Sequence, residues 1–183
     1  VTEYWLSDPR RAIEAQTMLY SQFMSVWSNS LQKLGGQEVD DLVKPEKGDK
    51  RFHDEDWSKN AFFDFLKQAY LVTSRWAFDL VDKTENLDDH TRHKAGFYVQ
   101  SLANAFSPSN FVLTNPELYK ETIAANGQNL VEGMKKLAED IQAGNGDLKI
   151  RQVDTKPFVI GENIAATPGK VVARSELVEI IQY

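Results

Sequence analysis

Cysteine is absent from this 183-residue sequence, and only three histidines are present. Without cysteine, disulfide bonds and cysteine-based metal sites are excluded, and a cytoplasmic setting is compatible with the sequence. No apolar run approaches the roughly 20 residues that a membrane-spanning helix needs. Positive charge is also scarce: 27 acidic residues outnumber 21 basic ones, no Lys/Arg-rich run occurs, and the net charge is −6. This balance argues against a nucleic-acid partner, because phosphate neutralisation needs a basic face.

Motifs that carry chemistry are missing as well. The sequence contains no nucleophile elbow, no Walker loop and no dinucleotide-binding fingerprint, and Gly144-Asn145-Gly146 fits a helix stop better than a phosphate cradle. We therefore assign no catalytic, cofactor-binding or metal-binding residue. A domain of this size without convergent reactive groups favours a binding or scaffolding role over catalysis.

Three weak candidates for chemistry remain. His90 and His93 lie three residues apart beside Asp88 and Asp89, but a metal site needs further ligands, so a solvated helix start is the favoured interpretation. His53 stands alone and is equally compatible with a surface position. The acidic run from Asp54 to Asp56 resembles paired carboxylates, but it fits a charge cluster at a helix N-terminus better.

The first long helix is predicted to start at Pro9, capped by Ser7 or Asp8, and to end at Gly35. Alternating steps of four and three residues along it form a heptad seam. The seam comprises Ile13, Thr17, Tyr20, Met24, Trp27, Leu31 and Leu34, and it is widened by Leu19, Phe23 and Val26. Core packing is the favoured interpretation of so wide a stripe, and a helix offered to a partner is the alternative.

The middle of the chain predicts an exposed linker over residues 36–57, broken by Pro45 and Gly48. A mostly apolar helix is predicted to follow over residues 58–83. That helix is the expected centre of the core. A third helix is predicted over residues 87–107, and a fourth over residues 115–143 with Asn115 as its cap and Pro116 at its first position. Gly127 lies on the apolar stripe of the fourth helix, where close approach of another backbone would explain it.

The stretch SPSNFVLTNPELYK, residues 107–120, holds two successive helix-start signals. Ser107-Pro108 is predicted to end the third helix and open a short turn, and Asn115-Pro116 to open the fourth helix. Phe111, Val112 and Leu113 between them are expected to plug this corner into the core.

From Leu148 onward the pattern changes to short Val- and Ile-rich segments: LKIRQVD, PFVI and KVVARSELVEIIQY. These predict strands. The expected fold is mainly α, with a helical domain over residues 1–148 and a β-rich segment over residues 149–183. Because the chain begins with Val1 and stops inside a strand-like run, we expect it to be part of a longer protein.

Three segments together resemble one known family. They are PEKGDKRFHDEDWSKNAFFDFLKQAYLVTSRW, SPSNFVLTNPELYKETIAANGQNLVEGMKKLAEDI and NIAATPGKVVARSELVEIIQY, in this order between Pro45 and Tyr183. They resemble the N-terminal region of poly(3-hydroxyalkanoate) synthases of the class I type. The resemblance implies that the complete enzyme transfers 3-hydroxyacyl groups from coenzyme A thioesters to a growing polyester.

In that family the nucleophilic Cys, with its His and Asp, lies on a downstream α/β-hydrolase domain, so no catalytic residue is carried over to this chain. The resemblance implies that the N-terminal region supports homodimer formation, attachment to the polyester granule and contact with phasin-type granule proteins. On the first helix, Tyr20, Phe23 and Trp27 are the candidate interface residues. A free-standing helical adaptor and a segment with its own catalytic or substrate-binding role are the competing hypotheses.

Overall fold

The computed structural model describes residues 1–150 and 152–183, which form two compact units, Val1–Leu130 and Val131–Tyr183. The first unit holds α1 (Thr2–Leu6), α2 (Pro9–Leu34), the 3₁₀ turn η1 (Lys50–Phe52), α3 (Asp56–Lys59), α4 (Ala61–Asp82), α5 (Asp89–Ala105), the 3₁₀ turn η2 (Pro108–Asn110) and α6 (Pro116–Ala124). Helix α7 (Gln128–Ala143) begins at the end of this unit and continues into the second. The prediction of a mainly α protein is confirmed.

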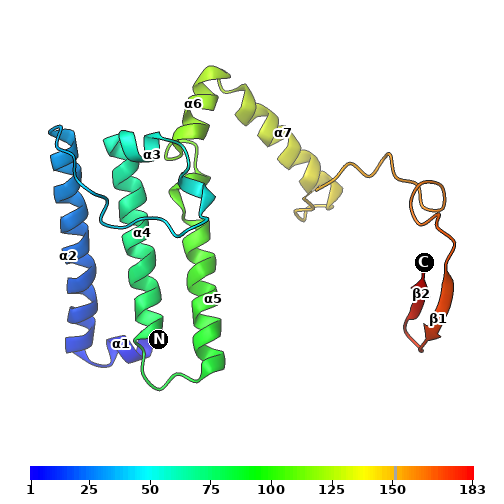
Figure 1. Cartoon of the computed structure of the whole chain (residues 1–183), viewed down its shortest axis with the longest axis horizontal. Helices are drawn as coiled ribbons and strands as arrows, with labels where there is room; N and C mark the ends of the chain where they lie inside the picture. Colours follow the sequence, from blue (N-terminus) through cyan, green and yellow to red (C-terminus); the bar gives the residue numbers. More distant parts are fainter. Residues whose placement is uncertain (151) are drawn as a thin grey trace. The chain divides into compact units, whose positions relative to one another are not determined.

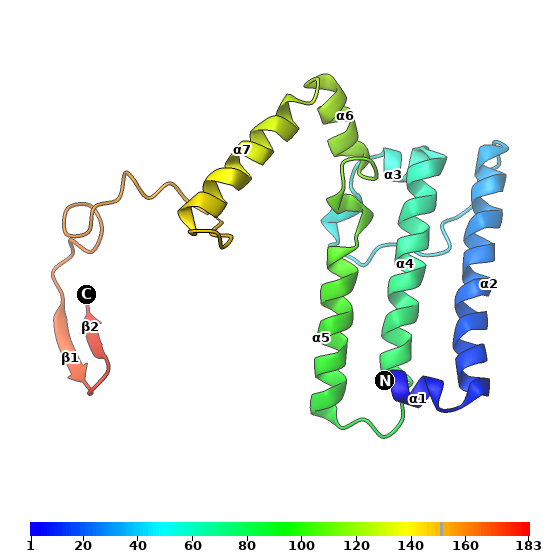
Figure 2. The same cartoon turned by 180° about the vertical axis from the view of Figure 1, so that it is seen from behind.

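In the first unit, α2, α4 and α5 lie side by side as one layer, with α4 in the middle (Figures 1 and 2). Helix α4 is therefore the central helix, as the sequence predicts. The core is small and centred on it, and includes Val26, Trp57, Phe63, Leu71, Val72 and Val81. None of the helices in the described part of the chain is both long and apolar enough to cross a membrane.

Local capping sets the helix boundaries in the first unit. Asp8 accepts a hydrogen bond from the N–H of Arg10 at the start of α2, and Gly35 follows its last turn. Asn60 caps α4 in the same way. Each cap pairs a backbone N–H that has no partner within its helix.

Side chains from α1 and α5 bind the C-terminal end of α4, and no pattern in the sequence predicts these contacts. Trp5, on the short and unpredicted helix α1, donates its indole N–H to the Leu80 carbonyl at 2.9 Å and to Thr84 Oγ1 at 3.1 Å. Arg92 of α5 donates to the carbonyls of Val81, Asp82 and Thr84. The terminal carbonyls of α4 are thereby satisfied by side chains from both neighbouring segments.

The segment after α2, predicted as an exposed linker, is a strap (residues 37–49) bound across α2 and α4. The Gln68 side chain accepts from the N–H of Val43 and donates to its carbonyl, both at 2.9 Å. Asn29 donates to the Asp40 carbonyl, and Arg75 donates to the Lys44 carbonyl. The predicted exposure is confirmed, because no residue of the strap is buried and most are exposed. The strap is nevertheless not a free linker, since hydrogen bonds from polar helix residues, which composition does not reveal, fix its backbone.

The corner between α5 and α6 has the predicted order, with η2 starting at Pro108 and α6 capped by Asn115, whose Oδ1 accepts from the N–H groups of Glu117 and Leu118. The prediction that Phe111, Val112 and Leu113 pack into the core is wrong for Phe111 and Leu113, which are 49% and 73% exposed, while Val112 is half-buried. Ser107, Pro108 and Pro116 are buried instead. Rigid prolines and hydrogen-bonded polar groups form this corner.

The predicted single helix over residues 115–143 is two helices, α6 and α7, separated at Ala125–Gly127. Asn126 and Gly127 both have positive φ angles, 50° and 78°. A Cβ on Gly127 would meet nothing within 4 Å, so the expectation of a close backbone approach is wrong. Glycine serves here because it adopts a positive φ without the steric cost of a side chain.

The second unit contains most of α7 and a hairpin of β1 (Lys170–Arg174) and β2 (Glu179–Gln182). The strands are antiparallel, pair Lys170 with Gln182, and have an irregularity between Val171 and Ala173. PFVI forms only an isolated bridge between Ile160 and Ile164. LKIRQVD forms no strand in its described residues, and its Arg151 lies outside them. Among the described residues of this unit none is buried, so the hairpin has no core of its own.

Candidate functional site

The heptad seam of α2 is exposed. Its six large apolar side chains are between 49% and 70% accessible: Ile13, Tyr20, Met24, Trp27, Leu31 and Leu34. The buried residues of the helix lie on another face, at Ala15, Val26 and Ser30. Core packing, the favoured interpretation of this stripe, is therefore wrong for the seam and holds only for the residues beside it. We call the set from Ile13 to Leu34, with Thr17, the α2 seam.

Contacts to α4 explain which face of α2 turns inward. Trp76 of α4 donates its indole N–H to the Ala15 carbonyl at 2.8 Å. The Trp27 ring meets the edge of Phe65 on α4, with 5.8 Å between centroids. Trp27 is thus anchored on one side while 53% of it stays accessible.

The structure separates the three residues that the sequence proposes as an interface. Tyr20 and Trp27 lie on the α2 seam, and Tyr20 is 66% exposed. Phe23 is half-buried and lies off the seam, toward the packed face. Met24 and Leu31, which the sequence places on the same seam, complete the exposed set.

The α2 seam also lies in a region without charge. No Asp, Glu, Lys, Arg or His occurs between Gln16 and Gln32, although 26% of the chain is charged. Surfaces of soluble helices usually carry charged side chains opposite their packed face. An exposed apolar face of this kind is a candidate contact surface.

Opposite the seam, a closed ring of charges fixes the strap to the helices. Lys33 of α2 lies 2.7 Å from both Asp41 of the strap and Asp64 of α4, and Lys67 lies 3.0 Å from each of these carboxylates. The Lys67–Asp64 contact is an ion pair without a well-aligned hydrogen bond. Asp64 and Lys67 are only 2% and 3% exposed, so each needs its partners to offset desolvation.

The ring changes the proton affinity of its two outer members. Burial of Lys33 acts to lower its pKa, but hydrogen bonds to Asp41 and Asp64 outweigh this effect and raise the pKa. Burial of Asp41 acts to raise its pKa, but hydrogen bonds from Lys33 and Lys67 outweigh it and lower the pKa. Both groups are therefore held in their charged forms, as a structural ion-pair network requires.

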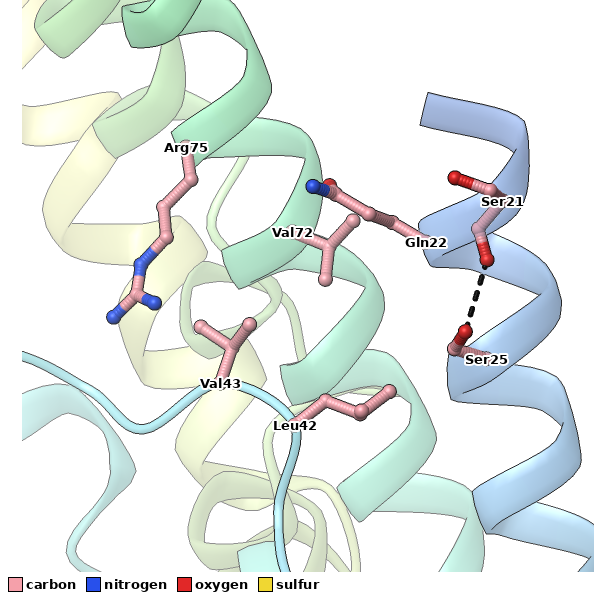
Figure 3. Close-up of a pocket in the computed structure, with 7 residues that line it drawn as sticks. All are labelled: Ser21, Gln22, Ser25, Leu42, Val43, Val72 and Arg75. Atoms are coloured by element: carbon pink, nitrogen blue, oxygen red, sulfur yellow. Dashed lines mark hydrogen bonds between the residues drawn. The ribbon is translucent and has the colours of Figure 1, made fainter. Parts of the chain in front are cut away.

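A depression of about 370 Å³ lies where the strap passes between α2 and α4 (Figure 3). It is lined by Ser21, Gln22, Ser25, Leu42, Val43, Val72 and Arg75. Gln22 reaches from α2 toward Val72, and the Ser25 hydroxyl donates to the Ser21 carbonyl. No histidine or carboxylate lines this depression to activate a serine, so its geometry does not form a nucleophile with its base.

The weak chemical candidates have structural roles. Asp88 caps α5 by accepting from the N–H of Thr91, and hydrogen bonds with Thr91 lower its pKa. His90 and His93 follow in the first turns of α5. Within residues 1–150 and 152–183, no group of three or more potential ligands could hold a metal ion.

The acidic run near His53 behaves as a helix N-terminal cluster. Asp54 accepts from the N–H of Asp56 and binds Lys120 of α6 through both oxygens, at 2.8 and 2.9 Å. These hydrogen bonds, led by that of Lys120, lower the pKa of Asp54. The sequence predicts the cluster but not its pairing with α6.

Sequence reasoning missed the polar residues of α4 that hold the strap: Asp64, Lys67 and Gln68. Their spacing is a usable signal, since these three polar residues interrupt the otherwise apolar first half of the helix, residues 61–72. Polar groups at buried positions require partners, and the strap provides them.

Comparison with known proteins identifies the family of the chain. Residues 48–183 match the family model described as "Poly-beta-hydroxybutyrate polymerase (PhaC) N-terminus". The chain is 58% identical over its whole length to a poly(3-hydroxyalkanoate) polymerase subunit PhaC of Rhizobium meliloti (strain 1021), and 48% identical to a poly(3-hydroxyalkanoate) polymerase of Methylorubrum extorquens. Identity to the Cupriavidus necator subunit is 35% over 74% of the chain. The chain spans about 30% of the length of the first two relatives. No solved structure matches it.

Proposed function

This chain belongs to the family of poly-beta-hydroxybutyrate polymerase N-terminal regions, and we propose that it is the non-catalytic helical domain of a polymerase that builds polyester from 3-hydroxyacyl-CoA. Its role is to support dimerisation, localisation at the polyester granule in the cytoplasm, and contact with phasin-type partners. The observation that carries this proposal is the exposed, uncharged α2 seam.

Catalysis belongs, in this proposal, to an α/β-hydrolase domain in the part of the polymerase that the relatives have beyond the matched 30%. The chain contains no cysteine to act as the nucleophile. The β1–β2 hairpin, whose described side chains are all exposed, fits a segment that packs against such a domain. Residues 149–183 would then begin the catalytic domain.

The granule role is tested with seam variants whose fold is monitored. The variant Tyr20→Ser/Met24→Ser/Leu31→Ser removes three exposed apolar side chains and spares half-buried Phe23 and the Trp27–Phe65 contact. Gln22→Ser/Gln32→Ser changes two exposed residues on the same helix, away from the seam, and is the matched control. We expect the seam variant to lose binding to purified polyester granules while its thermal unfolding matches the control. Unchanged granule binding by the seam variant would show that the α2 seam does not attach the chain to granules.

A free-standing helical adaptor is the second candidate, supported by the lack of a nucleophile–base pair in the depression under the strap. Turnover of 3-hydroxybutyryl-CoA separates the candidates. We expect no turnover by this chain and polymer formation by the complete gene product. A complete product without a Gly-x-Cys-x-Gly motif and without turnover would favour the adaptor.

A further inference from the structure

A second depression lies where the strap passes over α4 and α5, and we call it the strap–α5 depression. It has a volume of about 90 Å³, which is space for several water molecules. Its polar lining includes Lys44 and Glu46 of the strap, Ser74 and Arg75 of α4, and Gln100 of α5. Three segments that are distant in the sequence therefore contribute polar side chains to one concave surface.

Part of the charge around this depression is already paired. Arg51 donates to the two carboxylate oxygens of Asp49, at 2.9 and 2.8 Å, and to the Tyr70 hydroxyl at 2.7 Å. Hydrogen bonds between the two charged groups raise the pKa of Arg51 and lower the pKa of Asp49. Tyr70 in turn donates to the Ala103 carbonyl of α5. This pair is therefore a fixed wall of the depression and is not available to a ligand.

Four other polar side chains of the depression do have binding capacity left. Within the described part of the chain, Lys44 and Glu46 make no ion pair through their side chains, and the Ser74 hydroxyl makes no hydrogen bond. Arg75 donates one N–H to the Lys44 carbonyl at 3.0 Å and has no acidic partner among the described residues. Figure 3 shows its guanidinium pointing away from α2. Cationic donors without acceptors on one concave surface indicate a site for an anion.

The unpaired charges favour a ligand with a single negative charge. Lys44 and Arg75 contribute +2 and Glu46 contributes −1, so their sum is +1. A monoanion neutralises this sum, whereas a zwitterion such as an amino acid leaves it unchanged. The planar guanidinium of Arg75 suits a carboxylate in particular.

The remaining walls indicate the rest of the ligand. Leu71 and Phe78 line the depression with apolar surface, which suits a short alkyl group. The Glu46 carboxylate is an acceptor, and a ligand hydroxyl supplies it with a neutral donor. We propose that the strap–α5 depression binds the anion of a short hydroxy acid, with the carboxylate at Lys44 and Arg75 and the hydroxyl at Glu46.

This binding site goes beyond the proposed function, and only the choice of 3-hydroxybutyrate as the probe rests on that function. Hydrolysis of one ester bond in a 3-hydroxyacyl polyester consumes one water molecule and releases a free hydroxyl and a free carboxylate. Complete hydrolysis yields the 3-hydroxy acid. The depression would therefore bind the breakdown product of the polymer on the non-catalytic domain.

Amide NMR spectra of the 183-residue chain, recorded during titration with sodium 3-hydroxybutyrate, test the site. We expect saturable shifts in the strap and in the middle of α4, and no such shifts with sodium chloride at the same ionic strength. Lys44→Met keeps the carbonyl that accepts from Arg75 and removes one cation. It should weaken binding about tenfold, which corresponds to the loss of one charge-assisted hydrogen bond.

Lys47→Met is the matched control, because Lys47 is an exposed strap lysine that does not line the depression. It should bind 3-hydroxybutyrate as the wild type does. Shifts that do not saturate, or equal weakening by the two lysine substitutions, would overturn the proposal.

Two further probes test which parts of the acid are recognised. Butyrate lacks the hydroxyl and should bind the wild type more weakly than 3-hydroxybutyrate does. Glu46→Leu removes the acceptor for the hydroxyl and should abolish this difference between the two acids. Inorganic phosphate has no alkyl group, and phosphate binding as tight as that of 3-hydroxybutyrate would contradict a hydroxy-acid site.

Granule binding separates this inference from the proposed function. Lys44→Met leaves the α2 seam intact, so it should bind purified polyester granules as the wild type does. If the seam variant keeps its granule binding while 3-hydroxybutyrate still binds the wild type, the localisation role fails and the hydroxy-acid site stands. If the seam variant loses granule binding and no titration saturates, the hydroxy-acid site fails and the localisation role stands.

Discussion

The side-chain amide of Gln68 clamps the backbone of Val43, accepting from its N–H and donating to its carbonyl, both at 2.9 Å. The geometry is that of one rung of a β-ladder, with a helix side chain in place of the second strand. Gln68 is only 4% exposed, so its amide has few alternative partners. Through this pair the strap becomes part of the helical layer.

We expect Gln68→Ala to destabilise the chain by about 1–3 kcal/mol, because it leaves the N–H and carbonyl of Val43 unpaired in a part-buried position. Gln16→Ala, at an exposed position of α2, is the matched control and should change stability by less than about 0.5 kcal/mol. Chemical denaturation measures both. Equal effects of the two substitutions would show that the clamp contributes nothing.

The buried charge ring predicts non-additive effects. Asp64→Leu removes one of the two carboxylates that pair with buried Lys67 and should cost about 3–5 kcal/mol of unfolding free energy. Asp64→Leu/Lys67→Met removes both charges and should cost less than the single change, since no unpaired charge stays buried. A double-mutant cycle from denaturation curves checks this. Additive losses would contradict a coupled ring.

The ring also predicts a pH window for stability. The pKa of Asp41 in the folded chain lies below its ordinary value of 3.8, so its contribution is present above pH 3.8 and is lost as the pH falls through the folded pKa. The pKa of Lys33 lies above 10.5, so its contribution is present below pH 10.5 and is lost at higher pH. We expect Asp41→Asn to flatten the acid side of a plot of unfolding free energy against pH. An acid side identical to that of wild type would contradict the assignment.

Two glycines near the α6–α7 junction form a matched pair. Gly127 has a φ of 78° and open space around it, so Gly127→Ala and Gly127→Leu should cost a similar amount, about 1–2 kcal/mol, set by backbone conformation. Gly133 lies inside α7, also in open space, and Gly133→Ala should stabilise by about 0.5–1 kcal/mol. Thermal unfolding measures the three variants. A much larger loss for leucine than for alanine at residue 127 would indicate crowding instead.

The cap of α6 has separable parts. Asn115→Ala removes the Oδ1 acceptor for the N–H groups of Glu117 and Leu118 and should cost about 1 kcal/mol. Asn115→Asp keeps this acceptor and loses only the donation from Nδ2 to the Ser109 carbonyl, so it should be less destabilising. If aspartate is as costly as alanine in denaturation, the Ser109 contact rather than the cap holds this corner.

Most helix boundaries in the first unit could be predicted because their signals are local. Asp8, Asn60 and Asn115 cap the helices that follow them, and they do so through atoms two or three residues away. The break at Asn126-Gly127 has a signal too, an Asn-Gly pair, but the apolar stripe that continues across it predicts a single helix. Periodicity shows that residues share a face and does not show that one helix carries them.

The sequence by itself determined the helical class, the caps, the heptad spacing of α2 and its uncharged stretch, since these depend on neighbours along the chain. Only the tertiary structure decided that Ala15 and Val26 face α4 while Tyr20 and Leu31 face outward. Helix α2 has apolar residues on two faces, and periodicity does not show which of the two is buried. It also decided that Lys67 is buried, since a charge enters a core only where distant residues pair with it. Long-range partners therefore decided which apolar stripe of α2 is buried and which is exposed.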